Sequence, residues 1–368
     1  MKRIVVSVIV ALMMVFAACG AQTPSGTETS SATETTQPNT EQSEQAQDSE
    51  TPVVSETEDG NSEIDALEGK FNYEILPNPE SKAVRIAVIM VNNNPFWLDV
   101  VAGAESVKQV MADKYNCTVD IITVDDFDGQ VFAETIDTCV VKEYDAITTV
   151  GVSDAIVPAI NRAVDAGISV YTFNSDTEME SKRTAFVGQD LYAAGEVAGE
   201  KLAELIGGKG KVAIITGLYS VNAHELRRTG IEASLAKYPD ITIVGTVENH
   251  DSADEAYTAA KDFITAHPDL AGIIVTAGGP HGAAKAVDEL GLKDKISVVC
   301  FDTTTEIISY IKKDVIKATI GQDPFGQGAD PVVLAYNQII SGKAAVTGDA
   351  FTAMDAYTPD NISEYFPD

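Results

Sequence analysis

The sequence predicts an α/β protein built from two similar lobes, each around a parallel β-sheet. Short apolar runs alternate with segments of helical periodicity 10–15 residues long, which is the pattern of βαβ units. The first run, Val84–Met90, is almost continuously apolar, as expected for a parallel strand covered on both faces. All the runs together would make one unusually wide sheet. Two sheets of five or six strands each fit better the roughly 300 residues that carry this pattern.

The first half of this pattern occupies residues 84–187. Its first helix begins near Pro95, a residue suited to the first turn of a helix because its missing N–H needs no partner there. The expected strands are 84–90, 118–124, 146–150, 169–173 and a short one near 185–187, with helices at 95–114, 130–141 and 156–166.

The pattern then restarts, which is why a second lobe is expected. The expected helices are 192–205, 223–237, 253–266, 282–290 and 306–312, alternating with strands at 211–216, 242–247, 272–276, 296–301 and 317–320. A last long helix is expected at about 329–341.

The N-terminus has the pattern of a secretory signal. Lys2 and Arg3 precede a short apolar stretch that ends in two alanines, and this stretch is too short to span a bilayer comfortably. The ending Phe16-Ala-Ala-Cys19 resembles a bacterial lipobox, which implies lipidation of Cys19 and a protein held on the extracytoplasmic face of the cell membrane. A plain secretory signal cut near Ala18 is the alternative.

The segment 20–65 is expected to be a disordered tether. It is rich in Thr, Ser, Glu and Gln and holds 11 acidic residues but no Lys or Arg, so it lacks the apolar surface that offsets ordering entropy. The chain carries a net charge of −31, and removing the signal's two basic residues and the tether leaves −22 for residues 66–368. This acidity argues against nucleic acid and against anionic membrane surfaces as partners of residues 66–368.

Beyond Cys19 the chain has three cysteines, an odd number that rules out a complete disulfide framework. Cys300 lies inside an apolar run and is expected to be a buried free thiol. A Cys117–Cys139 bridge is left open.

Motifs for catalysis or cofactors are absent. His224-Glu225 lacks the second histidine of the H-E-x-x-H zinc motif, and no G-x-G-x-x-G or P-loop occurs. The sequence therefore predicts no cofactor and no metal site.

Ligands of parallel α/β sheets bind at the carboxyl ends of strands, so the loops there are candidates for the site. The first such loop ends in Pro95-Phe96-Trp97, which contains the single tryptophan. Two paired rings offer a flat apolar platform for the C–H face of a sugar ring. The alternative is a helix start with a hydrophobic staple and no ligand role.

Several motifs together resemble the ribose/galactose-type periplasmic binding proteins of ABC importers. They are Asn93-Asn-Pro-Phe-Trp97, Thr265-Ala-His-Pro-Asp269, Val299-Cys-Phe-Asp302-Thr-Thr and Ala318-Thr-Ile-Gly-Gln322, in the family's order over about residues 83–345. The resemblance implies a type I fold, in which two Rossmann-like lobes are joined by a three-crossover hinge and close on a ligand.

The resemblance also implies where the lobes meet. The crossovers are expected near 188–189, 322–323 and 351–352. The chain then divides into a signal peptide (1–19), the tether (20–65), an N-terminal lobe (66–188 plus 323–352) and a C-terminal lobe (189–322 plus 353–368).

Seven ligand-binding residues follow from the family's motifs, position by position. In the first lobe Asn94 supplies an amide, Phe96 and Trp97 supply rings, and Asn174 stands where ribose binders have a charged residue. The second lobe contributes an arginine, Arg227, whose planar fork suits vicinal oxygens, unless the register slips and Arg228 faces inward. Asp302 accepts hydrogen bonds from hydroxyls, and Gln322 is an amide at the hinge edge.

Three departures from the ribose binders indicate a different ligand. Asn174-Ser175 replaces an Asp-Arg pair, Ala277-Gly278 replaces an Asn-Asp pair, and Asp251 replaces an aromatic residue. A nucleoside or another furanose would satisfy the same residues.

The sequence thus predicts a lipid-anchored receptor that captures a small polar molecule, most simply a monosaccharide or polyol, and delivers it to an ABC permease. One alternative is a sensor of the same fold that signals to a membrane kinase or chemoreceptor. A second is a secreted hydrolase centred on Ser153, in the sequence Gly151-Val-Ser-Asp-Ala155 that loosely imitates a nucleophile elbow.

Overall fold

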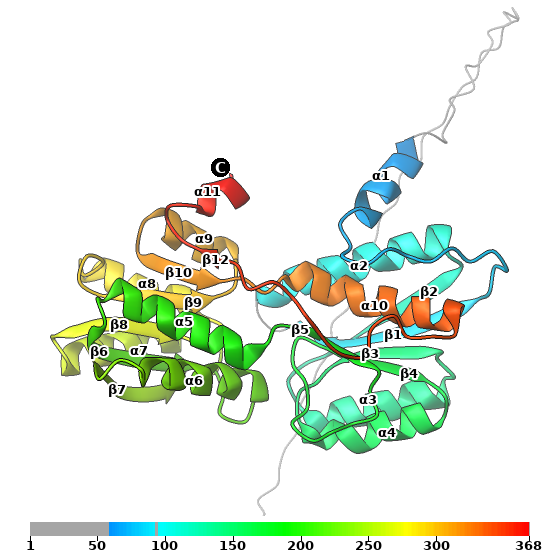
Figure 1. Ribbon diagram of the computed structural model, residues 1–368, viewed down its shortest axis with the longest axis horizontal. Helices are drawn as coiled ribbons and strands as arrows, with labels where there is room; N and C mark the ends of the chain where they lie inside the picture. Colours follow the sequence, from blue (N-terminus) through cyan, green and yellow to red (C-terminus); the bar gives the residue numbers. More distant parts are fainter. Residues whose placement is uncertain (1–58, 93–94, 368) are drawn as a thin grey trace, which may run out of the picture. The chain divides into compact units, whose positions relative to one another are not determined.

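The structure is a computed structural model, and it describes residues 59–92 and 95–367, which belong to one compact unit. They form two six-stranded sheets, each flanked by helices (Figure 1). We call the part built on the first sheet the N-lobe and the part built on the second the C-lobe. The predicted α/β fold with two lobes of mainly parallel sheets is confirmed.

The N-lobe sheet has the order β11-β5-β4-β3-β1-β2, and its strands are all parallel. Helices α2 and α10 lie on one face of this sheet, and α3 and α4 lie on the other (Figure 1). The strands are β1 (Val84–Val91), β2 (Cys117–Val124), β3 (Ala146–Val150), β4 (Ser169–Phe173), β5 (Ala185–Gly188) and β11 (Gly348–Phe351). The helices are α1 (Asp59–Glu68), α2 (Phe96–Lys114), α3 (Gly129–Val141), the 3₁₀ turn η1 (Asp154–Ile156), α4 (Val157–Asp165) and α10 (Pro324–Ser341).

The C-lobe sheet repeats this plan with the order β12-β10-β9-β8-β6-β7, and only its short last strand is antiparallel among the described pairs. The strands are β6 (Lys209–Thr216), β7 (Asp240–Glu248), β8 (Leu270–Val275), β9 (Ser297–Phe301), β10 (Ile316–Ile320) and β12 (Ala356–Tyr357). The helices are α5 (Leu191–Leu205), α6 (Asn222–Leu235), α7 (Ala253–Ala266), α8 (Pro280–Glu289), α9 (Thr305–Lys312) and α11 (Ile362–Tyr365).

Apolar side chains on both faces of the strands build these layers. Along β6, Val212 and Ile214 pack into one core with α5 and α6, whereas Ala213 and Ile215 pack into another with α7 and α8. Successive side chains of a strand point to opposite faces, so a continuous apolar run is what a sheet covered on both sides requires.

The chain passes between the lobes three times within the described residues. It does so between β5 and α5, between β10 and α10, and between β11 and β12. These passages lie at 189–190, 321–323 and 352–355, close to the expected crossovers.

The expected tether extends too far toward the body. Residues 59–65, which were assigned to it, belong to helix α1. Ile64 of this helix is only 6% exposed, and Lys114 of α2 forms ion pairs with Asp65 and Glu68. This acidic helix is held against α2 by one buried apolar side chain and by ion pairs. Composition alone could not indicate these contacts. The signal, Cys19 and the rest of the tether lie outside the described residues.

Other boundaries also differ from expectation. Helix α10 begins at Pro324 rather than near residue 329, because Asp323 caps it by accepting a hydrogen bond from the N–H of Gly326 at 3.0 Å. The short elements β11, β12 and α11 were not expected. Strands of two to four residues carry too little periodicity to be recognised.

The three described cysteines are free and buried. The buried thiol expected at Cys300 is confirmed, and the alternative bridge between Cys117 and Cys139 is absent. Burial raises the pKa of Cys117 and of Cys300 to about 12, so both remain protonated thiols near neutral pH.

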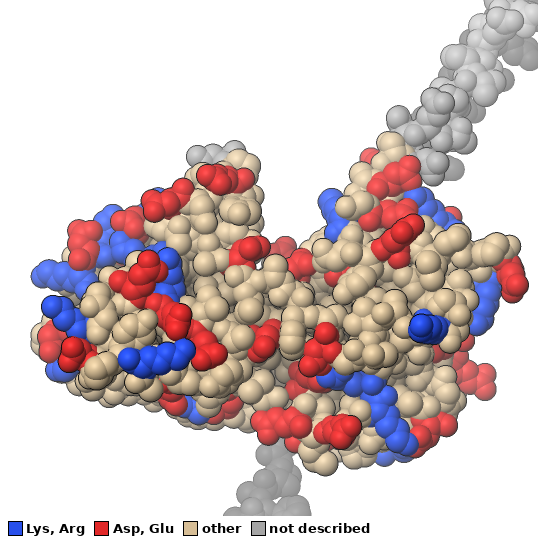
Figure 2. Space-filling view, in the orientation of Figure 1, with Lys and Arg blue, Asp and Glu red and all other residues tan. Residues whose placement is uncertain are grey.

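Within the described residues, every helix is too short or too polar to serve as a membrane-spanning segment. Acidic side chains are spread over both lobes with basic ones between them, and the face in Figure 2 shows no continuous basic surface.

Candidate functional site

One cavity is lined by both lobes at the carboxyl ends of their strands. Six of the seven predicted ligand residues line it, and the seventh, Asn94, lies outside the described residues. The lining from the N-lobe is Phe96, Trp97, Phe127 and Asn174, and that from the C-lobe and its crossovers is Leu191, Ala223, His224, Arg227, Asp251, Ala277, Gly278, Asp302 and Gln322.

The N-lobe contributes aromatic rings. Phe96 and Trp97 open helix α2 and pack edge to face, with their ring centroids 5.3 Å apart, and Phe127 stands 6.0 Å from Trp97. Trp97 is only 2% exposed, so most of its indole belongs to the N-lobe core. The tryptophan is therefore a structural residue as well as a wall of the cavity, which the sequence did not indicate.

Asn174 follows β4 in a left-handed conformation (φ 65°), which asparagine tolerates better than most residues. Its side-chain Nδ2 donates to Oε1 of Gln327 on α10 at 3.0 Å. The amide thus lines the cavity from a position fixed by Gln327 of α10.

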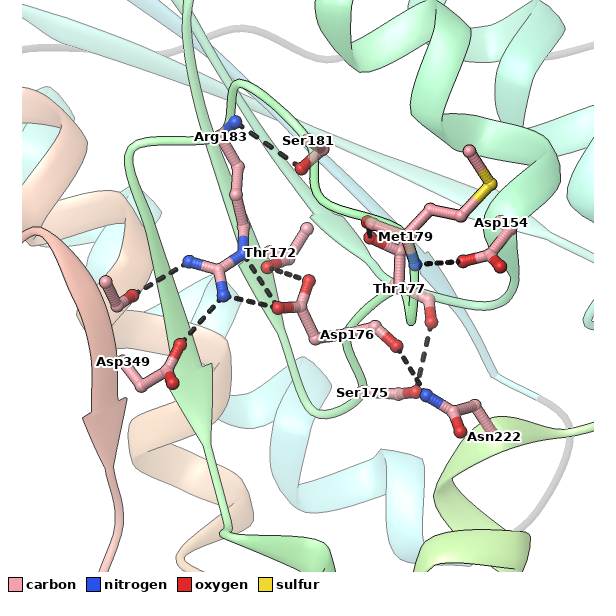
Figure 3. A network of polar contacts seen from close by, with 12 residues as sticks. Asp154, Thr172, Ser175, Asp176, Thr177, Met179, Ser181, Arg183, Asn222 and Asp349 are labelled. Atoms are coloured by element: carbon pink, nitrogen blue, oxygen red, sulfur yellow. Dashed lines mark hydrogen bonds and ion pairs between the residues drawn. The ribbon is translucent and has the colours of Figure 1, made fainter.

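A polar network holds the loop that carries Asn174 (Figure 3). The Asp176 carboxylate accepts from Nε of Arg183 at 2.7 Å and from Oγ1 of Thr172 at 2.9 Å. Arg183 also donates to Asp349 of β11 at 2.8 Å. From the C-lobe, Nδ2 of Asn222 donates to the backbone oxygen of Asp176 at 3.0 Å, so one hydrogen bond joins the two lobes at this rim.

Arg227 is the central charged group of the C-lobe wall. Its guanidinium donates to Oε1 of Gln189 and to Oε1 of Gln322, both at 2.9 Å, and lies 4.3 Å from the ring centroid of Phe301. Burial lowers the pKa of Arg227, but arginine keeps its charge in proteins. Gln189 and Gln322 lie on the first two crossovers, so they orient the arginine rigidly.

The register of α6 is resolved in favour of Arg227. Arg228, the neighbouring candidate, points away and pairs with Glu225 and Glu232 at 2.7 and 2.6 Å. It does not line the cavity.

Asp302 is one of the two carboxylates that line the cavity. It is buried in a left-handed conformation (φ 75°) after β9, and Nε2 of Gln322 donates to its Oδ1. Burial raises the pKa of this carboxyl, whereas the charge of Arg227 and the hydrogen bond from Gln322 oppose the rise. Its other oxygen, Oδ2, accepts from no described residue and remains available to a ligand donor.

Sequence reasoning missed His224 and Phe127 as lining residues and treated Asp251 only as a departure. His224 lies three residues before Arg227 on α6, a spacing that puts both on one helix face, so a helical projection would have found it. Phe127 stands between acidic residues in the loop after β2, where no periodicity marks it.

Ser153, the candidate nucleophile, is not in this cavity. It precedes η1 and lines a separate hollow with Asp154, Tyr219 and Asn222, and no histidine lines that hollow. The described residues also contain no group of three or more His, Cys, Asp or Glu side chains that could hold a metal ion.

Over residues 86–344 the chain matches the family described as the periplasmic binding protein domain. It is 24% identical over 315 residues to the xylose/arabinose-binding protein XylF of Sulfolobus acidocaldarius, covering 78% of this chain and 74% of that protein. It is 26% identical over 248 residues to the D-ribose/D-allose-binding protein of Pseudomonas aeruginosa, covering 65% and 76%.

Solved structures show the same architecture. The glucose-galactose binding protein GanP from Geobacillus stearothermophilus is similar with a TM-score of 0.69 and 29% identity, over 76% of this chain and 99% of that one. An ABC transporter solute-binding protein from Burkholderia graminis, in complex with D-arabinose, is similar with a TM-score of 0.71 and 27% identity, over 77% and 98%.

Proposed function

Because the chain belongs to the periplasmic binding protein domain family, we propose that it is a receptor that captures a neutral sugar or polyol between its two lobes. The observation that carries the proposal is the two-sided lining of the cavity. Rings on one wall suit the C–H face of a sugar ring, and the charged and amide groups on the other wall suit its hydroxyls.

The lobes are proposed to move as units, residues 59–188 plus 323–352 against 189–322 plus 353–367. A ligand held by both walls would favour the closed arrangement, because its full set of hydrogen bonds forms only when both lobes contact it. The three short passages between the sheets are the natural hinge.

We further propose that the receptor is lipid-anchored through Cys19 on the extracytoplasmic face and delivers its ligand to an ABC permease. It is proposed to act by binding and release rather than as an enzyme, since relatives are named as binding proteins and the described lining of the cavity contains no Ser, Thr, Cys or Lys side chain.

Isothermal titration calorimetry of the full chain tests the ligand proposal. The probes are D-ribose, D-xylose, D-allose, D-galactose, D-glucose, L-arabinose and xylitol, with adenosine and L-leucine as ligands of other classes. We expect saturable binding of at least one sugar or polyol. If only adenosine or leucine binds, the protein is a receptor but its ligand is not a sugar. If none of the probes gives a heat of binding, the proposal is contradicted.

The anchor is tested separately by metabolic labelling with a clickable palmitate in a bacterial host. We expect label in the wild-type chain and none in Cys19→Ala. Equal labelling of both would contradict lipidation at Cys19. Uptake of the bound sugar by cells with and without the gene tests the importer role, and unchanged uptake would favour a sensor.

A further inference from the structure

Two cavity residues of the C-lobe, His224 and Asp251, have no counterpart in the motifs that identify the family. His224 comes from α6, and Asp251 follows β7, so two elements bring them together at one end of the cavity. Nε2 of His224 lies 3.9 Å from Oδ1 of Asp251, which is too long for a direct hydrogen bond. Each group therefore keeps unused hydrogen-bonding capacity.

The ring of His224 has a defined tautomer. Its Nδ1 accepts a hydrogen bond from the backbone N–H of Leu218 at 2.9 Å, so Nδ1 carries the lone pair. Burial lowers the pKa of His224, which keeps the ring neutral. The single ring proton then lies on Nε2, and Nε2 donates to no residue in the described part of the chain.

The carboxylate of Asp251 is the complementary acceptor. The N–H of Gly278 donates to its Oδ1 at 2.7 Å, and its Oδ2 accepts from none of the described residues. Glycines make room for both groups, since a Cβ at Gly217 would lie 2.4 Å from Nδ1 of His224 and one at Gly278 would lie 3.0 Å from Oδ1 of Asp251. The pair is thus held in place by its surroundings and not by a bond between its members.

We propose that His224 and Asp251 together recognise one hydroxyl group of the ligand, which accepts from Nε2 of His224 and donates to the carboxylate of Asp251. This rests on the proposed sugar-binding function and adds a specificity-determining pair to it. A hydroxyl supplies a donor and an acceptor at one atom, whereas an ether or carbonyl oxygen cannot donate and an ammonium cannot accept. A carboxylate at that position would be repelled by Asp251, so the pair disfavours an acidic group there.

The pair should make the site prefer ligands that carry this hydroxyl group. A ligand without this hydroxyl would leave a buried N–H and a buried carboxylate unpaired, and sites built for a hydroxyl discriminate strongly against analogues that lack it. One monodeoxy form of the sugar should therefore bind far more weakly than the parent.

The test is calorimetry on the full chain with the best-bound sugar from the panel above and its monodeoxy forms. We expect the wild-type chain to bind one of these forms about 100-fold or more weakly than the parent. The His224→Phe and Asp251→Ala variants should bind the parent sugar at least tenfold more weakly than wild type does. In these variants the difference in affinity between the parent sugar and the same monodeoxy form should shrink to a few-fold. His250→Phe is the matched control, because His250 is exposed, pairs with Glu255 and does not line the cavity.

Asp251→Asn keeps the shape of the side chain and replaces Asp251→Ala if thermal unfolding shows that the alanine variant is not folded. The proposal is overturned if these variants bind the parent within threefold of wild type, or if they keep the preference for the parent over the same deoxy form. If no sugar binds the wild-type chain, the proposed function fails and this inference falls with it. Normal binding with an unchanged preference overturns this inference alone.

Discussion

The two lobes share a strand order but line their common cavity with different chemistry. In each sheet the second strand lies at one edge, followed by the first, third, fourth and fifth strands and then by a short strand from the C-terminal part of the chain, β11 in the N-lobe and β12 in the C-lobe. Yet the N-lobe supplies three aromatic rings and one amide, whereas the C-lobe and its crossovers supply the arginine, the histidine and both carboxylates. The repeated scaffold fixes where loops meet, and the residues in those loops decide what each wall does.

The largest effect is expected on stability, at Trp97, which belongs both to the N-lobe wall of the cavity and to the N-lobe core. Trp97→Ala removes a side chain that is 2% exposed, so it should lower the free energy of unfolding by about 3–5 kcal/mol, measured by urea denaturation. Its neighbour Leu98 is 62% exposed, and Leu98→Ala should change the free energy by less than about 0.5 kcal/mol. If the two substitutions change the free energy of unfolding equally, Trp97 is not part of the N-lobe core.

The C-lobe wall should respond in ligand affinity. Arg227→Met leaves Asp302 buried without its counter-charge and removes donors, so sugar binding should weaken about 100- to 1000-fold, or about 3–4 kcal/mol. Arg228→Met is the matched control, since Arg228 faces Glu225 and Glu232 outside the cavity, and its affinity should stay within about twofold. If the Arg228 variant lost binding and the Arg227 variant kept it, the register of α6 would be wrong.

Each lobe buries a carboxyl with a raised pKa, but only Asp302 lines the cavity. In the N-lobe, burial raises the pKa of Asp330 to about 6, although the backbone and side chain of Asn72 donate to it. Between about pH 4 and pH 6 the folded protein holds a proton that the unfolded chain releases, so the free energy of unfolding falls as pH rises through this range. The fall should reach on the order of 3 kcal/mol.

Denaturation of wild type and Asp330→Asn at several pH values checks this expectation. The free energy of unfolding of wild type relative to the variant should fall between pH 4 and 6, with and without bound sugar, because only wild type carries the Asp330 carboxyl. A slope that disappears only when sugar is added would instead belong to Asp302, whose pKa a bound hydroxyl donor should lower.

The smallest effect is expected at the rim, where one side-chain hydrogen bond among the described residues joins the lobes. Asn222→Ala removes the hydrogen bond to the backbone oxygen of Asp176 and should weaken sugar binding about fivefold, or about 1 kcal/mol. Asn161→Ala is the control, because Asn161 accepts from Lys182 within the N-lobe, and its affinity should not change. Identical affinities in both variants would show that the rim contact does not contribute to closure.

Sequence patterns predicted the layers of the fold well because parallel strands such as β1 are apolar on both faces and read as continuous runs. Phe96 and Trp97 were predicted because they follow the end of a strand. The other predicted lining residues came from the resemblance to the family's motifs. Helix α1 was missed because an acidic segment with one buried isoleucine has the composition of a tether. His224 was missed although its spacing from Arg227 marks it, whereas its closeness to Asp251 arises only on folding.

Arg227 has a consequence beyond the pocket itself. Its guanidinium binds Gln189, which lies on the first crossover, donates to the backbone oxygen of Gly321 and is not part of the cavity lining. A substitution at Gln189 would change the fraction of molecules whose arginine is correctly oriented, and the apparent dissociation constant scales inversely with that fraction. In the proposed receptor, the ligand concentration for half-saturation could therefore be tuned from the first crossover without a change in the cavity lining.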